Sequence, residues 1–335
     1  MSVTKRGVAM ISITHLVRTA LAAAMMFALG TSAATAQAQV WPQRAVRFIV
    51  TLGPGSGADI GARLVAEKLA ARWGQPVVVE NRPGGDGFVG IGAFVNSRDD
   101  HVLLYAPASS FTAHPYLHEK LPYDPRDLAP VARVSATLIT ISVPPSMNIN
   151  SLGQLVEAAR AQPGKLNWAT VTGATDLVLA AFLKSAGLNM AKIPYRDPVQ
   201  AVNDVSEARL HLYWSSYAIV RPAAQAGRAK IIVTPASAPT PTLPGIPTVA
   251  QAGYPGLTFD GLIGLYGQRD MPIEVRERIA TDVKAVLADP AIGARLVATG
   301  QEVAPGSAAE FAASIETQRA GLAEIAKVLG IKAAQ

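Results

Sequence analysis

The chain has 335 residues, half of them hydrophobic and only 16% charged, with a formal net charge of +6. This composition excludes a disordered chain, and the length is sufficient for two lobes that each bury a core. The absence of cysteine excludes a disulfide framework, a thiolate site and a cysteine-linked lipid anchor.

The first 38 residues predict a secretory signal peptide. Lys5 and Arg6 supply positive charge, an apolar run covers 21–29, and the small residues AQA at 36–38 form a cleavage site. The apolar run is too short to span a membrane, so an N-terminal anchor is the less favoured alternative. Cleavage would remove three basic residues and no acidic one, so the net charge falls from +6 to +3. We therefore expect a periplasmic protein that has no nucleic-acid partner.

In the first part of the mature chain, short apolar runs alternate with amphipathic stretches. The predicted strands are 45–52, 76–80 and 102–106. Between the first two, Ile60, Leu64 and Leu69 recur at helical spacing, and Gly74 ends the helix. This alternation of strands and helices predicts a mostly parallel, doubly wound sheet.

A second set of elements begins near residue 134. A β-branched segment at 134–143 predicts an extended strand, and Ser151 with Gln154 forms a capping box before a helix at 152–161. The further predicted strands are 166–170, 192–195, 209–214 and 229–234.

The last hundred residues contain a proline-rich stretch and two helices. Apolar residues are spaced through 235–256, so this stretch is predicted to be ordered. One helix is predicted at 272–288, and a capping box of Ser307 and Glu310 opens the last one.

Two α/β units in one chain predict two lobes joined by crossing strands, with a ligand cleft between them. The predicted division is a signal peptide at 1–38, a first lobe of 39–140 and 236–335, and a second lobe of 141–235.

The stretch TLGPGSGADI at 51–60 forms a glycine-rich loop between a predicted strand and a predicted helix. Backbone N–H groups in such a loop, together with the positive end of the helix, attract an anion; a plain tight turn is the alternative. Ala58 and Asp59 follow Gly57 where a P-loop needs lysine and a hydroxyl, and the third glycine of a dinucleotide fingerprint is missing, so a nucleotide is disfavoured. Asp59 is predicted to cap the helix.

Three other stretches sit between a predicted strand and a helix. The glycine-rich turn at 81–90 is best interpreted as structural. The threonines of 169–182 can cap the next helix or hold a carboxylate. Ser109 and Ser110 follow the third strand, at the sheet edge where ligands bind in open α/β folds.

Catalytic and metal-binding patterns are weak. His114 and His118 have the spacing of a helical metal pair, but Pro115 separates them and Glu119 is the only nearby acid. There is no G-x-S-x-G motif, and no spacing selects a catalytic triad. We expect no catalytic residue, no metal and no cofactor, and a hydrolase is the least favoured function.

The ordered series of these motifs resembles the extracytoplasmic solute receptors of tripartite tricarboxylate transporters, also called Bug-type binding proteins. The resemblance starts with WP at 41–42 and includes the glycine loop, with VVVENRPGGDGFVG at 77–90 as its most specific part. It continues through LPYDPRDLAPVARV (121–134), PGKLNWAT (163–170), IPYRD (193–197), AGRAKIIVT (226–234) and LPGIPTVAQAGYPG (243–256).

The resemblance implies a two-lobed, type II-like periplasmic binding protein of Venus-flytrap form. Such a monomeric receptor captures a small carboxylate, such as a di- or tricarboxylate or an aromatic acid, and delivers it to membrane permease subunits. In the family, main-chain N–H groups at two opposed helix starts hold the ligand. The residues expected to line the site are Gly55, Ser56, Gly57, Ala58, Asp59, Ser109, Ser110, Thr170, Thr172, Gly173, Ala174, Thr175 and Ser215.

The chain departs from the family pattern within these loops. Ser56 replaces a usual glycine, Ala58 a usual threonine, and Val178 a common histidine. Ser215 stands where many members have an aspartate that can pair with a ligand amine, which argues against an amino-acid ligand. A periplasmic sensor that feeds a signalling partner is the alternative, and the sequence does not separate it from a transport receptor.

Overall fold

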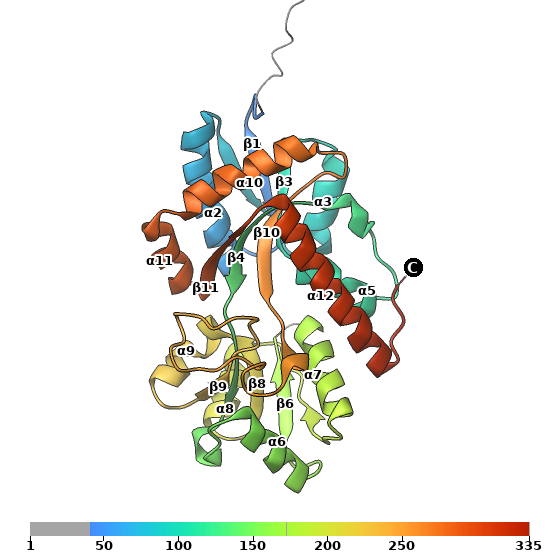
Figure 1. The fold of residues 1–335 in the computed structure, drawn as a ribbon, viewed down its shortest axis with the longest axis vertical. Helices are drawn as coiled ribbons and strands as arrows, with labels where there is room; N and C mark the ends of the chain where they lie inside the picture. The colour runs from blue at the N-terminus through green and yellow to red at the C-terminus, as the bar shows by residue number, and fades with distance from the viewer. Residues whose placement is uncertain (1–40, 172, 335) are drawn as a thin grey trace, which may run out of the picture. The chain divides into compact units, whose positions relative to one another are not determined.

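The computed structural model describes residues 41–171 and 173–334, and within them it leaves out the side chain of Ser110. The predicted signal peptide at 1–38 and the site residue Thr172 lie outside the described residues. The strands of the described part form two sheets, one of six strands and one of five (Figure 1).

The first sheet has the strand order β11-β4-β10-β3-β1-β2. Its strands are β1 (Val46–Val50), β2 (Val77–Asn81), β3 (Val102–Pro107), β4 (Ala129–Thr137), β10 (Gly261–Gly267) and β11 (Gln301–Gly306). β1 runs parallel to β2 and β3, whereas β10 runs antiparallel to both of its neighbours, β3 and β4. A strand from late in the chain therefore completes a sheet that the early strands begin.

The second sheet has the strand order β7-β6-β8-β5-β9. Its strands are β5 (Ile139–Val143), β6 (Asn167–Thr170), β7 (Ala191–Lys192), β8 (Leu212–Ser216) and β9 (Lys230–Val233). β6 is parallel to β7 and β8, and β5 is antiparallel to β8 and β9. The fold is the predicted two-lobed α/β class, and the three early strands are parallel as predicted. Neither sheet is mostly parallel, however, because the strands that connect the sheets run antiparallel to their neighbours.

Helices flank both sheets (Figure 1). They are α2 (Gly57–Trp73), α3 (Phe88–Ser97), α4 (Ser109–Thr112), α5 (His114–Leu117), α6 (Leu152–Ala161), α7 (Gly173–Ser185), α8 (Pro198–Ser206), α9 (Tyr217–Gln225), α10 (Ile273–Leu287), α11 (Pro290–Ala298) and α12 (Ala308–Leu329). In the part of the chain that the structure describes, no helix combines the length and the apolar character needed to cross a bilayer.

Most predicted helix ends are confirmed. Gly74 adopts a left-handed conformation (φ 66°) directly after α2, and its N–H donates to the carbonyl of Ala70. The Ser151 side chain accepts from the Gln154 N–H at the start of α6. At the start of α12, Ser307 and Glu310 form the predicted reciprocal capping box.

The predicted single strand at 134–143 is divided. Leu138 separates β4, in the first sheet, from β5, in the second, so this segment carries the chain between the sheets. β10, α11 and β11 were not predicted from the sequence. β10 reads GLIGLYG, and its glycines weaken the strand pattern although its burial is nearly complete.

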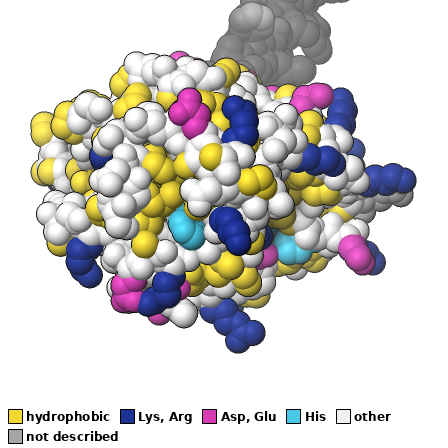
Figure 2. Space-filling view, turned by 90° about the horizontal axis from the view of Figure 1, so that it is seen from below, with side chains coloured by type: hydrophobic (Ala, Val, Ile, Leu, Met, Phe, Trp, Pro, Cys, Tyr) yellow, Lys and Arg dark blue, Asp and Glu magenta, His cyan; other side chains and the backbone are white. Residues whose placement is uncertain are grey.

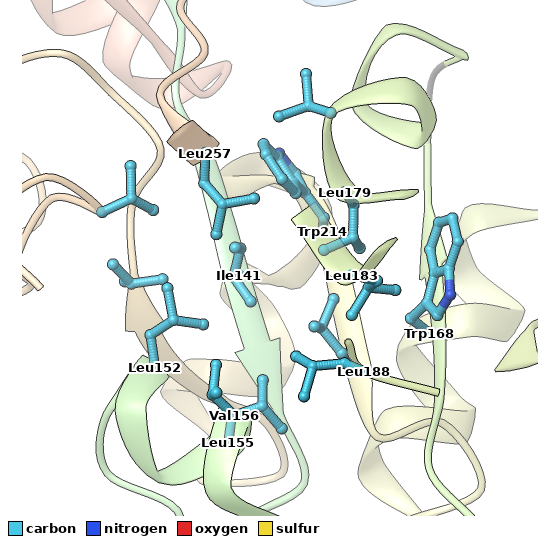
Figure 3. Close-up of a cluster of buried hydrophobic side chains, with 14 of the residues drawn as sticks. Ile141, Leu152, Leu155, Val156, Trp168, Leu179, Leu183, Leu188, Trp214 and Leu257 are labelled. Atoms are coloured by element: carbon cyan, nitrogen blue, oxygen red, sulfur yellow. The ribbon is translucent and has the colours of Figure 1, made fainter. Parts of the chain in front are cut away.

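One hydrophobic cluster lies on one face of the second sheet, and Figure 3 shows part of it. The labelled side chains are Ile141, Leu152, Leu155, Val156, Trp168, Leu179, Leu183, Leu188, Trp214 and Leu257. Val249, Leu257 and Phe259, from the proline-rich stretch and just after it, belong to this cluster. The predicted lobe division puts 236–335 in the first lobe; we propose instead a boundary close to Gly261, where β10 begins.

Gly264 in β10 provides a test of this packing. A Cβ at this position would meet the Phe311 ring and lie 2.5 Å from the Ala132 carbonyl oxygen. We expect Gly264→Ala to lower the free energy of unfolding by about 1–3 kcal/mol, because the added methyl overpacks a closed core. The measurement is urea unfolding.

Gly92→Ala is the matched control, since a Cβ at Gly92 in α3 meets no atom within 4 Å. Alanine there should raise stability by about 0.5–1 kcal/mol through its helix propensity. Equal stabilities of the two variants would contradict the tight contact at Gly264.

Candidate ligand-binding site

The first glycine loop joins β1 to α2 and is closed by two reciprocal hydrogen bonds. Ser56 is the N-cap of α2, and its Oγ accepts from the Asp59 N–H at 3.2 Å. The Asp59 Oδ2 accepts from the Gly55 N–H at 2.9 Å, and Gly55 is left-handed (φ 79°). The prediction that Asp59 caps the helix is therefore wrong. Asp59 is the third helical residue, and it turns back to hold the loop.

The Asp59 carboxylate is enclosed by the protein and only 3% of the residue is exposed. Its Oδ1 accepts from Arg63 Nε at 3.0 Å and from Asn81 Nδ2 at 2.9 Å. Burial alone would raise the pKa of Asp59, but hydrogen bonds from Gly55, Arg63 and Asn81 outweigh it, so the pKa lies below its ordinary value. Asp59 thus organises the loop and has its charge compensated by Arg63.

The first turn of α2 retains two backbone donors. The first N–H groups of a helix have no partner within the helix. Ser56 N–H donates to the Gly53 carbonyl at 3.2 Å, and Gly55 and Asp59 are paired as described above. No residue in the described ranges accepts from the N–H of Gly57 or Ala58. These two donors stand at the positive end of the helix, where an anion is stabilised.

The start of α2 packs against two buried polar side chains, Gln301 and Tyr105. A Cβ at Gly57 would lie 2.7 Å from Gln301 Nε2, and a Cβ at Gly61 would lie 2.7 Å from the Tyr105 hydroxyl. Gln301 is 1% exposed, and its Oε1 accepts from Ser135 Oγ at 2.6 Å. Gln301 was not predicted from the sequence, although two glycines four positions apart on one helix face are a signal of close approach.

The second loop, between β6 and α7, also has an acidic side chain that is held by hydrogen bonds within the protein. Thr170 Oγ1 donates to Asp176 Oδ1 at 2.5 Å, and Lys192 Nζ donates to the other Asp176 oxygen at 2.7 Å. The Thr170 hydroxyl is therefore engaged by the protein, like the Asp176 carboxylate. Gly173 and Ala174 begin α7, and no described residue accepts from their N–H groups. Thr175 follows them and is 2% exposed.

The predicted serines have different surroundings. Ser109 is half-buried at the start of α4, directly after β3, as expected for the carboxyl edge of the sheet. The side chain of Ser110 is outside the described part. Ser215 is fully buried in β8, a central strand, and its hydroxyl donates to the Ser216 carbonyl at 3.3 Å. A ligand contact through the Ser215 side chain therefore has no support, because a central strand is covered on both faces.

Each loop contacts elements that lead to the other sheet. Gly57 lies against the segment 299–301, and a Cβ on Gly300 would be 2.6 Å from the Ala218 Cβ in α9. On the other side, a Cβ on Gly173 would be 2.7 Å from Leu117 Cδ1 in α5. Both helix starts therefore lie where elements of the two sheets meet.

His114 and His118 pack in an aromatic cluster. Their ring centroids are 5.3 Å apart, and both contact the Phe88 ring. His114 Nδ1 is 2.9 Å from the Tyr123 hydroxyl, and His118 Nε2 is 3.2 Å from Asp86 Oδ2. Burial and the neighbouring His118 lower the pKa of His114 to about 4. These contacts favour a structural role for the pair.

One other group has ligand types suited to a metal. Among the described residues, Asp99, Asp100 and His101 place ligand atoms within 4.8 Å of one another. Arg44 already donates to Asp99 at 2.7 Å, and His101 Nδ1 lies 2.7 Å from Asp100. The group precedes β3, at the edge of the sheet away from the glycine loop, so it does not contribute to the candidate site.

The predicted structural turn at 81–90 is built from left-handed glycines. Gly84, Gly85 and Gly87 have φ values of 123°, 56° and 94°. Asp86, between the last two, also has a positive φ of 55°. Glycine adopts such conformations at the lowest cost, which explains the three glycines of NRPGGDG before α3.

Charged side chains are distributed singly on the face that Figure 2 presents. Lysines and arginines on this face alternate with acidic and apolar side chains. This face therefore has no concentrated basic surface of the kind that nucleic-acid binding needs.

Two α/β lobes are joined by crossing strands, and helix starts lie where elements of the two sheets meet. This is the architecture of periplasmic solute-binding proteins. A family model described as "Tripartite tricarboxylate transporter family receptor" matches residues 61–331, and the chain belongs to this family. Receptors of this family are periplasmic and solute-binding, and the family is not an enzyme class.

Known relatives cover nearly the whole chain. A UPF0065 protein of Bordetella bronchiseptica is 30% identical over 319 residues, which is 95% of this chain and 94% of the relative. The structure of R. palustris Rpa4515 with adipate has a TM-score of 0.71 and 26% identity, covering 87% of this chain and 99% of that one. The periplasmic binding protein BugD has a TM-score of 0.68 and 25% identity, with the same coverage.

The environment of Asp59 predicts a pH-dependent effect. We expect Asp59→Asn to reduce stability near neutral pH by about 1–3 kcal/mol, because the variant loses charge-assisted hydrogen bonds. The folded-state pKa is lowered, so the carboxylate contributes stability above its unfolded pKa of about 3.9 and loses it as the pH falls through the folded value.

Urea unfolding across pH is the measurement for Asp59→Asn. The difference in free energy of unfolding between the unmodified protein and Asp59→Asn should stay constant from about pH 5 to 8 and shrink below about pH 4. A difference that persists unchanged at the lowest pH would mean that the shape of the side chain matters and its charge does not.

Proposed function

We propose that this chain is a periplasmic receptor that binds a small organic carboxylate and delivers it to the membrane subunits of a tripartite tricarboxylate transporter. The observation that carries the proposal is the pair of helix starts. Gly57 and Ala58 in α2, and Gly173 and Ala174 in α7, have N–H groups without an acceptor among the described residues. Neighbouring protein carboxylates are already engaged.

The electrostatics of both loops favour an anionic ligand. Each helix start carries the equivalent of about half a positive charge, and hydrogen bonds to an ionised carboxylate are stronger than neutral ones. Asp59 and Asp176 would repel an anion if they faced it, but Arg63 and Lys192 pair with them. A dicarboxylate can place one carboxylate at each helix start, which makes it the preferred ligand class.

The relatives support the same class of ligand. Rpa4515 of R. palustris was crystallised with adipate, a straight-chain dicarboxylate. Backbone N–H groups hold an anion without attacking it or transferring a proton, so the proposed site serves binding and release. Loss of carboxylate uptake on deletion of the gene supports the transport role, whereas normal uptake would favour the sensor that the sequence left open.

The first prediction is stabilisation by carboxylates. We expect at least one of succinate, adipate, citrate and phenylacetate to raise the melting temperature, since a ligand at about 100 times its dissociation constant adds roughly 2.7 kcal/mol. Thermal-shift screening followed by calorimetry measures this effect. The corresponding neutral amides lack the negative charge and should give no shift. Equal binding of the amides, or no binding by any of the four acids, would refute the proposal.

The second prediction tests the backbone donors directly. Ala58→Pro removes one N–H from the second position of α2, where proline is compatible with the first helical turn. We expect it to weaken carboxylate binding at least about tenfold, because a charge-assisted hydrogen bond is worth about 1.5–3 kcal/mol. Calorimetry gives the affinity, and circular dichroism checks the fold.

Glu274→Pro is the control for Ala58→Pro. Glu274 is exposed and occupies the same second position, in α10. It should leave the affinity unchanged. A folded Ala58→Pro protein with full affinity would mean that the first helix start does not hold the ligand.

A further inference from the structure

Leu117 covers the start of α7. It is the last residue of α5 and is 38% exposed, which is high for a large apolar side chain. A Cβ on Gly173 would lie 2.7 Å from Leu117 Cδ1 and 3.0 Å from Cδ2. Gly173 is not among the glycines with a left-handed backbone. A side chain at 173 would therefore require Leu117 to move from the space that it occupies, whereas the backbone conformation at 173 would allow one.

The position of Leu117 is fixed by contacts on both sides of it. His114 Nδ1 lies 2.9 Å from the Tyr123 hydroxyl, and the Pro115 carbonyl accepts from the Ala334 N–H at 2.6 Å. His118 Nε2 lies 3.2 Å from Asp86 Oδ2. α5 has only four residues, yet these contacts hold it, so Leu117 is presented to α7 in a defined place.

Leu117 lies beside the two N–H donors of the second loop. In a helix each Cα–Cβ bond tilts toward the N-terminus. Leu117 fills the space that a Cβ of Gly173 would take. This space therefore borders the opening into which the N–H groups of Gly173 and Ala174 point. An anion held by these N–H groups has the two methyl groups of Leu117 as neighbours.

We propose that Leu117 determines selectivity at this site; the inference rests on the proposed function. Leu117 selects carboxylates whose carbon next to the bound carboxylate carries only hydrogen or belongs to an aromatic ring. A hydroxyl or amine on that carbon would lose water and meet methyl groups that offer no hydrogen bond. The ligand class is thus a dicarboxylate or aromatic acid without a polar 2-substituent.

The experiment compares acids that differ by one hydroxyl. The pairs are succinate with malate, adipate with 2-hydroxyadipate, and phenylacetate with mandelate, measured by calorimetry. For the pair that binds best, we expect the unmodified protein to prefer the unsubstituted acid by about tenfold or more, as an apolar contact can achieve. Leu117→Asn supplies a hydrogen-bonding group and should reduce the preference to less than about threefold, on the same principle.

Ile273→Asn is the matched control, because Ile273 is 45% exposed at the start of α10. It should leave the preference unchanged. If Leu117→Asn keeps the same preference for the unsubstituted acid as the unmodified protein, this inference is overturned and the proposed function is not. Failure of every acid to bind the unmodified protein overturns the proposed function, and this inference with it.

A double variant tests the steric basis. Gly173→Ala introduces a methyl group into the space that Leu117 fills and displaces the leucine side chain, so we expect it to weaken binding of the best acid about tenfold. Gly173→Ala combined with Leu117→Ala makes room again and should recover most of the affinity. Circular dichroism confirms that both proteins fold. A double variant that stays as weak as Gly173→Ala would show that Leu117 is not what requires glycine at 173.

Discussion

The first ligand loop depends on the buried Asp59 carboxylate. One of its oxygens holds the Gly55 N–H, and the other is held by Arg63 from the next turn of α2 and by Asn81 from β2. Because this carboxylate accepts a hydrogen bond from the Gly55 N–H, that N–H is not available to a ligand. What remains for an anion is the pair of N–H groups on Gly57 and Ala58, in a loop whose conformation is held by hydrogen bonds within the protein.

In the second loop, different residues restrain the acidic side chain near the helix start. Thr170 and Lys192 restrain Asp176 in the first turn of α7, so its charge is directed at the protein. Both helix starts therefore keep an acidic side chain without exposing it to an incoming anion. The two glycines, Gly57 and Gly173, are small for steric reasons, because Gln301 lies against one and Leu117 against the other.

Features made by residues close in sequence could be predicted from the sequence. The C-terminal end of α2 and the starts of α6 and α12 were predicted because a helix cap is formed within about four residues. The glycine loop and its place before a helix were likewise evident. The role of Asp59 was not, because Asn81 reaches it from the next strand, and Leu117 approaches Gly173 from another part of the fold. The antiparallel strands were missed for the same reason, since β10 pairs with β3 across more than 150 residues.

The insertion of β10 between β3 and β4 affects when this half of the molecule can form. During synthesis β3 and β4 emerge early, but they are not neighbours in the finished sheet, because β10 lies between them and pairs with both. The elements of the second sheet all emerge before β10 does. The half of the receptor that begins the chain is thus among the last parts to be completed, and until then its strands have exposed edges that must be kept from pairing with other chains.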